Sequence, residues 1–113
     1  MTGIELAKAA AKILEEKLGV DVKILKVEEL TIIAEYFVIV SGQSNTQVRA
    51  LADEVEYQLE LLNVTPKRKE GNSVGGWVVL DYTSVIVHIF HSETREFYSL
   101  ERLWADAKSI DTE

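Results

Sequence analysis

The chain has 113 residues, of which 47% are hydrophobic and 27% are charged, a balance typical of one globular domain with a single core. It contains no cysteine, which excludes disulfides, thiolate metal sites and a thiol nucleophile. The formal net charge is −7, with 12 basic and 19 acidic side chains. This balance argues against nucleic acid as the main partner and is compatible with a basic protein.

The N-terminal segment carries charges throughout and has no apolar signal-peptide core, and no apolar run approaches the ~20 residues that span a bilayer. We therefore expect a cytoplasmic protein that does not contact a membrane. Residues 1–107 are expected to form one domain, and the polar residues 108–113 a frayed C-terminal tail.

A helix is predicted to begin at Glu5 and to end at Lys17 or Leu18. Thr2 and Glu5 have the T-x-x-E spacing of a capping box, and Gly19 suits the C-terminal stop. A strand over residues 20–27 follows, because apolar and partly polar residues alternate there. The predicted buried stripe of the helix consists of Ile4, Ala7, Ala11, Leu14 and Leu18.

A central strand and a second helix come next. The run YFVIV at residues 36–40 consists of strong β-formers, which predicts a strand covered on both faces. Ser44 and Gln47 have the spacing of a capping box for the second helix, and Asn63 suits its C-terminal cap. Residues 65–70 predict an edge strand, where Pro66 is tolerated.

The last third predicts a hairpin and a helix. Two apolar runs, 77–82 and 85–91, are joined by a short polar turn. If the turn has two residues, Trp77 faces Phe90 and Val79 faces His88 across the hairpin. The fold class is α/β (α+β), with a mixed sheet and flanking helices. The expected stripe of the last helix consists of Phe97, Leu100, Leu103 and Trp104.

No catalytic constellation emerges from these elements. The loop SGQS at residues 41–44 could hold a phosphate at a helix start, but an ordinary capped turn is favoured. Asp81 is the only acidic residue in the hairpin strands, whereas nucleotidyl transfer needs paired carboxylates for two metal ions. His88 and His91 fall on opposite faces of a strand. We expect no enzyme activity, no cofactor and no metal.

Two features suggest contact with a partner. The hairpin is apolar on both faces, and a chain of this length can cover such a sheet only in part, so an exposed patch is expected. The basic cluster Lys67-Arg68-Lys69 is a possible RNA contact, although a solvated edge strand is favoured. The aromatic residues from which the patch would draw are Trp77, Tyr82, Phe90, Phe97, Tyr98 and Trp104.

Three blocks resemble the Iojap family of ribosomal silencing factors over nearly the whole chain. They are YFVIVSGQS at 36–44 with QVRALAD at 47–53, WVVLDY at 77–82 with VHIF at 87–90, and REFYSLERLW at 95–104. The chain departs from the family pattern at two places. Thr83-Ser84 stands where Gly-Asp is common, and Glu35 stands where Asp is common.

The resemblance implies a nucleotidyltransferase-like fold without enzymatic activity. It implies binding to the large ribosomal subunit through ribosomal protein L-fourteen, with a possible minor ribosomal RNA contact. The bound factor would sterically block joining of the small subunit and lower translation when nutrients are scarce. The same surface could support a homodimer of the free protein. The matched contact residues are Trp77, Asp81, Tyr82, His88, Phe90 and Tyr98.

The sequence is also compatible with two other functions. A nucleotide-binding or nucleotidyltransferase-type enzyme would bind nucleotide and metal near residues 41–44. An RNA-binding module would use Lys67, Arg68 and Lys69, and its affinity for naked RNA would depend steeply on salt.

Overall fold

The structure, a computed structural model, describes residues 1–98 and 105–112. Within these described residues, three helices and six strands form one α+β domain around a mixed sheet with strand order β3-β4-β5-β2-β1-β6. The central pair β2–β5 is parallel, and the other neighbours are antiparallel. The elements are α1 (Gly3–Glu16), β1 (Val20–Lys26), β2 (Tyr36–Gly42), α2 (Asn45–Leu61), β3 (Arg68–Asn72), β4 (Trp77–Asp81), β5 (Val85–His91), α3 (Ser92–Tyr98) and β6 (Lys108–Ile110).

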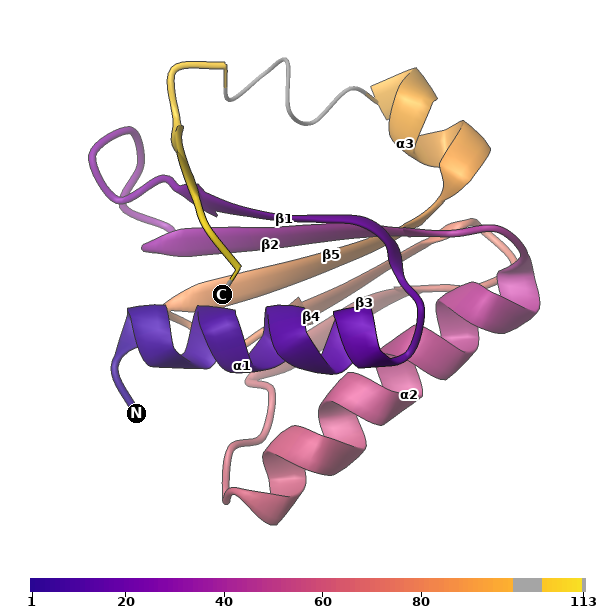
Figure 1. The fold of residues 1–113 in the computed structure, drawn as a ribbon, viewed down its shortest axis with the longest axis horizontal. Helices are drawn as coiled ribbons and strands as arrows, with labels where there is room; N and C mark the ends of the chain where they lie inside the picture. Colours follow the sequence, from indigo (N-terminus) through magenta and orange to yellow (C-terminus); the bar gives the residue numbers. More distant parts are fainter. Residues whose placement is uncertain (99–104, 113) are drawn as a thin grey trace.

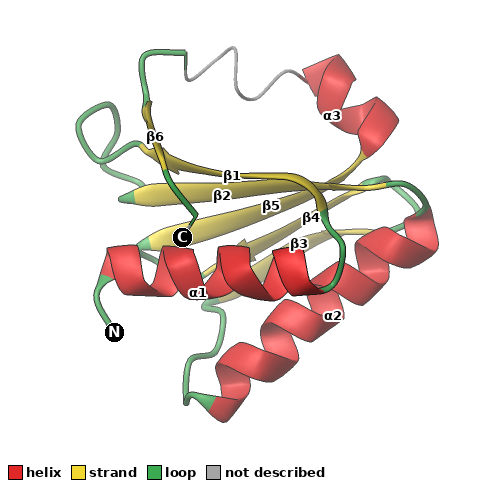
Figure 2. Cartoon of the chain, in the orientation of Figure 1, coloured by secondary structure: helices red, strands yellow, loops and turns green. Residues whose placement is uncertain are grey.

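The helices divide unequally between the two faces of the sheet. The long helices α1 and α2 lie against one face, and the short helix α3 lies on the other side (Figures 1 and 2). The predicted central strand is confirmed, because six of the seven residues of β2 are buried. A parallel pair at the middle of the sheet is buried on both faces, which explains the unbroken apolar run at 36–40.

Two hydrophobic clusters follow from this layering. The larger one, which we call the helix-side core, joins α1 and α2 to alternate strand residues such as Val38, Val87 and Leu80. The smaller one lies on the opposite face of the sheet and consists of Leu25, Val27, Ala34, Phe37, Ile39 and Phe90. Alternation along each strand therefore sends successive side chains into different clusters.

The hairpin of β4 and β5 has the predicted register. Trp77 pairs with Phe90 and Val79 pairs with His88. The amide of Tyr82 donates to the carbonyl oxygen of Val85 at 2.8 Å, which closes the two-residue turn. Trp77, Val79 and His88 thus lie on one face of the sheet, away from α1 and α2.

The ends of α1 confirm one prediction and change another. Thr2 and Glu5 form the reciprocal capping box, with the Thr2 amide 2.8 Å from Glu5 Oε1. These bonds lower the pKa of the Glu5 carboxyl. Leu18 adopts a positive φ of 63° at the helix end, with its side chain 78% exposed, so it does not belong to the buried stripe. Gly19 follows it and donates to the Leu14 carbonyl oxygen at 2.8 Å.

The capping of α2 is also partly as predicted. Ser44 Oγ accepts from the Gln47 amide, but Gln47 Oε1 accepts from the Gln43 amide rather than from Ser44. The box is therefore closed one residue earlier than the motif predicts. At the other end, Asn63 takes a positive φ of 63°, and its amide and that of Val64 donate to carbonyls of the last turn, as in a Schellman cap.

Both sheet edges differ from the sequence expectation. The edge strand β3 spans Arg68–Asn72, three residues later than the predicted start at 65. The tail expected to be frayed contains β6, which pairs antiparallel with β1 from Lys108 to Ile110. These three residues show no apolar alternation that would predict a strand, although Ile110 packs against the helix-side core. Of the predicted last helix, residues 99–104 lie outside the described residues.

Candidate partner-binding surface

The aromatic face is the part of the sheet that consists of Trp77, Val79, Asp81, Ile86, His88 and Phe90. Its three rings are nearly parallel. The Trp77 and Phe90 ring centroids lie 5.7 Å apart with planes 6° apart, and the planes of His88 and Phe90 differ by 5°. Phe90 is buried, whereas Trp77 is 37% exposed. Phe90 therefore supports the indole from below, and the indole is the part that a partner can reach.

A recess of about 230 Å³ opens in this face beside His88. Phe37 of β2 meets the imidazole edge to face, with ring centroids 4.8 Å apart. Ile33, from the β1–β2 loop, adds an exposed apolar side chain to the wall. The residues around the recess are Ile33, Phe37, Arg68, Glu70, Trp77, Val79, Asp81, Ile86 and His88.

His88 is the buried polar group of the surface. Its side chain is 7% exposed, and neither ring nitrogen has a hydrogen-bond partner. Burial lowers the pKa of His88 to about 4, because the apolar surroundings disfavour the imidazolium. The ring is therefore neutral at neutral pH and keeps one nitrogen that can accept a hydrogen bond.

Charged side chains come from β3 and β4. Asp81 Oδ1 accepts from the Thr83 amide at 2.8 Å, which ties the carboxylate to the hairpin turn. Arg68 and Glu70 of β3 form a loose ion pair at 3.8 Å, with both side chains largely exposed. Polar groups thus border the apolar wall, as in the rim of a protein interface.

Two of the sequence-predicted contact residues are not on this surface as described. Tyr82 belongs to the helix-side core, where its hydroxyl is buried without a partner, and burial raises the pKa of the phenol. The reason is strand alternation, since Tyr82 follows Asp81 and points to the opposite face. Tyr98 is the last residue of α3, and its side chain lies outside the description.

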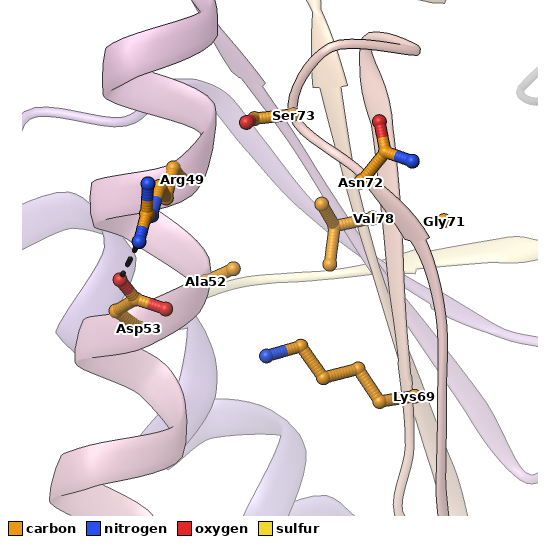
Figure 3. Close-up of a pocket in the computed structure, with 8 residues that line it drawn as sticks. All are labelled: Arg49, Ala52, Asp53, Lys69, Gly71, Asn72, Ser73 and Val78. Carbon is orange, nitrogen blue, oxygen red and sulfur yellow. Dashed lines mark ion pairs between the residues drawn. The ribbon is translucent and has the colours of Figure 1, made fainter.

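The basic cluster does not form a continuous patch. Arg68 borders the recess, whereas Lys69 points to the α2 side, where its Nζ lies 2.6 Å from Glu56 Oε1. A hollow of about 310 Å³ lies between α2 and the β3–β4 hairpin. Figure 3 shows Lys69 reaching across it towards the helix and Arg49 paired with Asp53. Each of these cations has a carboxylate beside it, which weakens attraction for RNA phosphates.

The turn at residues 41–44 is an ordinary cap. The amides of Gln43 and Gln47 donate to side-chain oxygens within the turn, and that of Val48 donates to the Ser44 carbonyl. Within residues 1–98 and 105–112, no group of three or more metal-ligating side chains gathers. In the same residues, no helix has the length and apolar character needed to cross a membrane.

Sequence reasoning missed two contributors. Ile33 joins the recess from a loop whose apolar residues showed no periodicity. Arg95 is 8% exposed and fixes the start of α3 against β1, with Nη1 2.8 Å from the Asp21 carbonyl oxygen and 2.9 Å from Ser41 Oγ. The sequence shows Arg95 only as a charged residue four positions after the apolar strand ends at His91, at the start of the REFYSLERLW block, and such a residue is usually exposed.

The fold and the surface thus define a class of protein, namely a small α+β domain that presents an aromatic face of its sheet. The family model "Ribosomal silencing factor during starvation" (RsfS) matches residues 1–113, and the chain belongs to this family. It is 37% identical over 106 residues to the ribosomal silencing factor RsfS of Bacillus subtilis, covering 94% of this chain and 90% of that one.

Two further proteins are similar to this chain, one in structure and one in sequence. A crystal structure of a Chromobacterium violaceum protein superposes with a TM-score of 0.89 at 34% identity, covering 93% of this chain and 88% of that one. The mouse protein named "Mitochondrial assembly of ribosomal large subunit protein 1" is 31% identical over 90 residues, which are 74% of this chain and 38% of the mouse protein.

Proposed function

We propose that this protein silences translation by binding the large ribosomal subunit and sterically blocking the joining of the small subunit. Family membership and the names of the relatives support a ribosome-associated regulatory role. The observation that carries the binding mode is the aromatic face, where a partly exposed Trp77 stacks on buried Phe90 beside a recess. A rigid aromatic anchor of this kind is a common hot spot of protein interfaces.

Ribosomal protein L-fourteen is the partner we propose for this surface. The net charge of −7 favours a basic ribosomal protein, because opposite charges steer the encounter. Trp77 is the apolar anchor, Asp81 and His88 supply polar specificity, and Tyr98 is a second anchor. Tyr82 is left out, because it is buried in the helix-side core.

The steric mechanism needs no bond to be made or broken, so the protein acts as a regulatory factor and not as an enzyme. We expect it to work in the cytoplasm, where translation takes place. A homodimer through the same face would cover the exposed apolar surface when no ribosome is present. Sedimentation velocity of the free protein at several concentrations would detect such a dimer.

Co-sedimentation tests the proposal. Purified protein is mixed with isolated large subunits, small subunits or joined ribosomes, and the pellets are compared. We expect selective pelleting with large subunits and fewer joined ribosomes after the two subunits are mixed. Binding to neither subunit would reject the proposal and would favour a nucleotide ligand, which calorimetry with nucleotide and magnesium would detect.

A pair of variants tests the surface itself. Trp77→Ala removes the anchor of the aromatic face, whereas Tyr57→Ala removes an exposed aromatic side chain from α2 on the other side of the sheet. We expect the Trp77 variant to lose pelleting and the Tyr57 variant to keep it. Equal binding by both folded variants would mean that the contact lies elsewhere.

A further inference from the structure

We propose that the recess beside His88 is a socket for one arginine side chain of the protein partner. This inference rests on the proposed function and deepens it, because it names the chemical group that the surface selects. It draws on the shape of the recess, its parallel rings, its charges and the unpartnered imidazole.

The size and walls fit a long side chain. The recess holds about 230 Å³, several times the ~30 Å³ that one water molecule occupies in the liquid. Its apolar walls come from Phe37, Val79, Ile86 and Ile33. The methylene stem of an arginine packs on such walls while its charged end remains near polar groups.

The ring geometry favours a planar cation. Trp77 and His88 lie with planes 12° apart and centroids 6.4 Å apart, and Phe90 continues the same set of planes. A guanidinium entering parallel to these rings gains a cation–π contact with the 37% exposed indole. Arginine fits this arrangement better than lysine, whose ammonium is a compact, strongly hydrated charge.

The charges around the recess favour a cation. Asp81 and Glu70 contribute two carboxylates and Arg68 one guanidinium, so the acidic groups exceed the basic one. Glu70 is only loosely paired with Arg68, because the two groups lie 3.8 Å apart and both are largely exposed. An incoming cation therefore displaces Arg68 from Glu70 at little cost. Asp81 is held by its bond to the Thr83 amide, so its carboxylate is oriented before the partner arrives.

His88 adds a hydrogen-bond acceptor to the lining of the recess. Both ring nitrogens are buried without partners, so the small exposed part of the residue belongs to other atoms. A half-turn of the imidazole exchanges the positions of its nitrogens and carbons, so that a nitrogen takes the place of a ring carbon. The neutral ring then accepts an N–H bond from the guanidinium, which relieves the cost of an unsatisfied buried nitrogen.

The direct test uses the full protein and two short peptides, acetyl-Ala-Arg-Ala-amide and its citrulline counterpart. Citrulline has nearly the shape of arginine without the charge. Binding is followed by the NMR shifts of the His88 nitrogens and of the Trp77 indole N–H. We expect saturable shifts with the arginine peptide and about tenfold weaker binding of the citrulline peptide. Equal binding of both peptides, or no shift at His88, would overturn the proposal.

Two variants localise the effect. Asp81→Asn keeps an oxygen to accept from Thr83 but loses the charge, and the matched control Asp53→Asn makes the same change on α2. His88→Phe keeps an aromatic ring and removes both nitrogens. Each recess variant should bind the arginine peptide at least about fivefold more weakly, and the control should bind like the parent. Parent-like binding by the folded recess variants would overturn the socket.

The same variants separate this inference from the proposed function. If the parent pellets with large subunits and both recess variants pellet equally well, the socket is rejected while the proposed function stands. If the parent does not pellet but selects the arginine peptide over the citrulline peptide, the socket is supported and the ribosomal role fails.

Discussion

Arg95 reaches back 74 residues along the chain to Asp21, where its Nη1 donates to the main-chain oxygen at 2.8 Å and its Nη2 lies 3.3 Å from Oδ2. Asp21 has a positive φ of 52° and lies where the register of β1 shifts against β2. The buried guanidinium thus satisfies the backbone of an irregular strand and connects α3 to the sheet through side-chain contacts.

Replacing Arg95 with alanine should destabilise the fold by about 3 kcal/mol, because buried Ser41 Oγ and the Asp21 carbonyl oxygen lose their donor and the side chain leaves a void. Urea unfolding gives the free energy. Arg49→Ala is the control, since Arg49 is exposed and its pair with Asp53 at 3.8 Å contributes little. Equal losses in the two variants would show that the Arg95 contacts are not structural.

Gly19 should tolerate no side chain. A Cβ there would lie 2.6 Å from Val40 Cγ2 and 2.9 Å from the Leu14 carbonyl oxygen, so Gly19→Ala should cost about 2 kcal/mol of unfolding free energy. At Gly75 the nearest atom would be 3.6 Å away, so Gly75→Ala should change thermal stability little. A melting temperature for Gly19→Ala equal to that of the Gly75 variant would contradict the close approach.

Replacing Thr83 with glycine should stabilise the fold. It adopts a φ of 75° in the β4–β5 turn, a conformation that costs a β-branched residue more than it costs glycine. Thr83→Gly should therefore raise the unfolding free energy by about 0.5–1 kcal/mol. Ser84→Gly, at a neighbouring position without positive φ, should lower it slightly. Chemical denaturation of both variants decides the sign.

The stability of the protein should decrease in mild acid because of His88. Its pKa is lowered from 6.5 to about 4, so the unfolded chain binds a proton that the folded chain refuses. The contribution is complete above pH 6.5, is lost as the pH falls towards 4, and amounts to about 3 kcal/mol. The difference in unfolding free energy between the parent and His88→Phe, measured from pH 7 to 4, isolates this residue from the carboxylates.

The central strands and the hairpin register could be predicted because they depend on local signals. The apolar run at 36–40 and the two-residue turn at 83–84 determine burial and pairing without knowledge of the rest of the chain. The strand β6 and the contacts of Arg95 could not be predicted, because they depend on segments more than 70 residues apart. Leu18 is exposed because α1 ends at Glu16, two residues before the last position of its hydrophobic pattern.

Residue types determine only part of the candidate binding surface, and the rest depends on the geometry of the fold. The register placed Trp77, His88 and Phe90 together, but only the structure separates exposed Trp77 from buried Phe90. The family resemblance adds Tyr82 to these residues, although alternation along the strand directs its side chain into the helix-side core. The recess needed Ile33 and β3, which sequence periodicity does not relate to the hairpin.

The length of the turn at residues 83–84 also determines which side chains of the hairpin are presented on the surface of the protein. Along β5, Val85, Val87 and Ile89 point to the helices, while Ile86, His88 and Phe90 point away. One inserted residue in that turn would favour a one-residue shift in the register of β4 against β5. The side chains of β4 would then exchange faces, so that Val78 and Leu80 would point away from the helices. Such a variant would have nearly the same composition, but its surface would expose core side chains and would bind other proteins without selectivity.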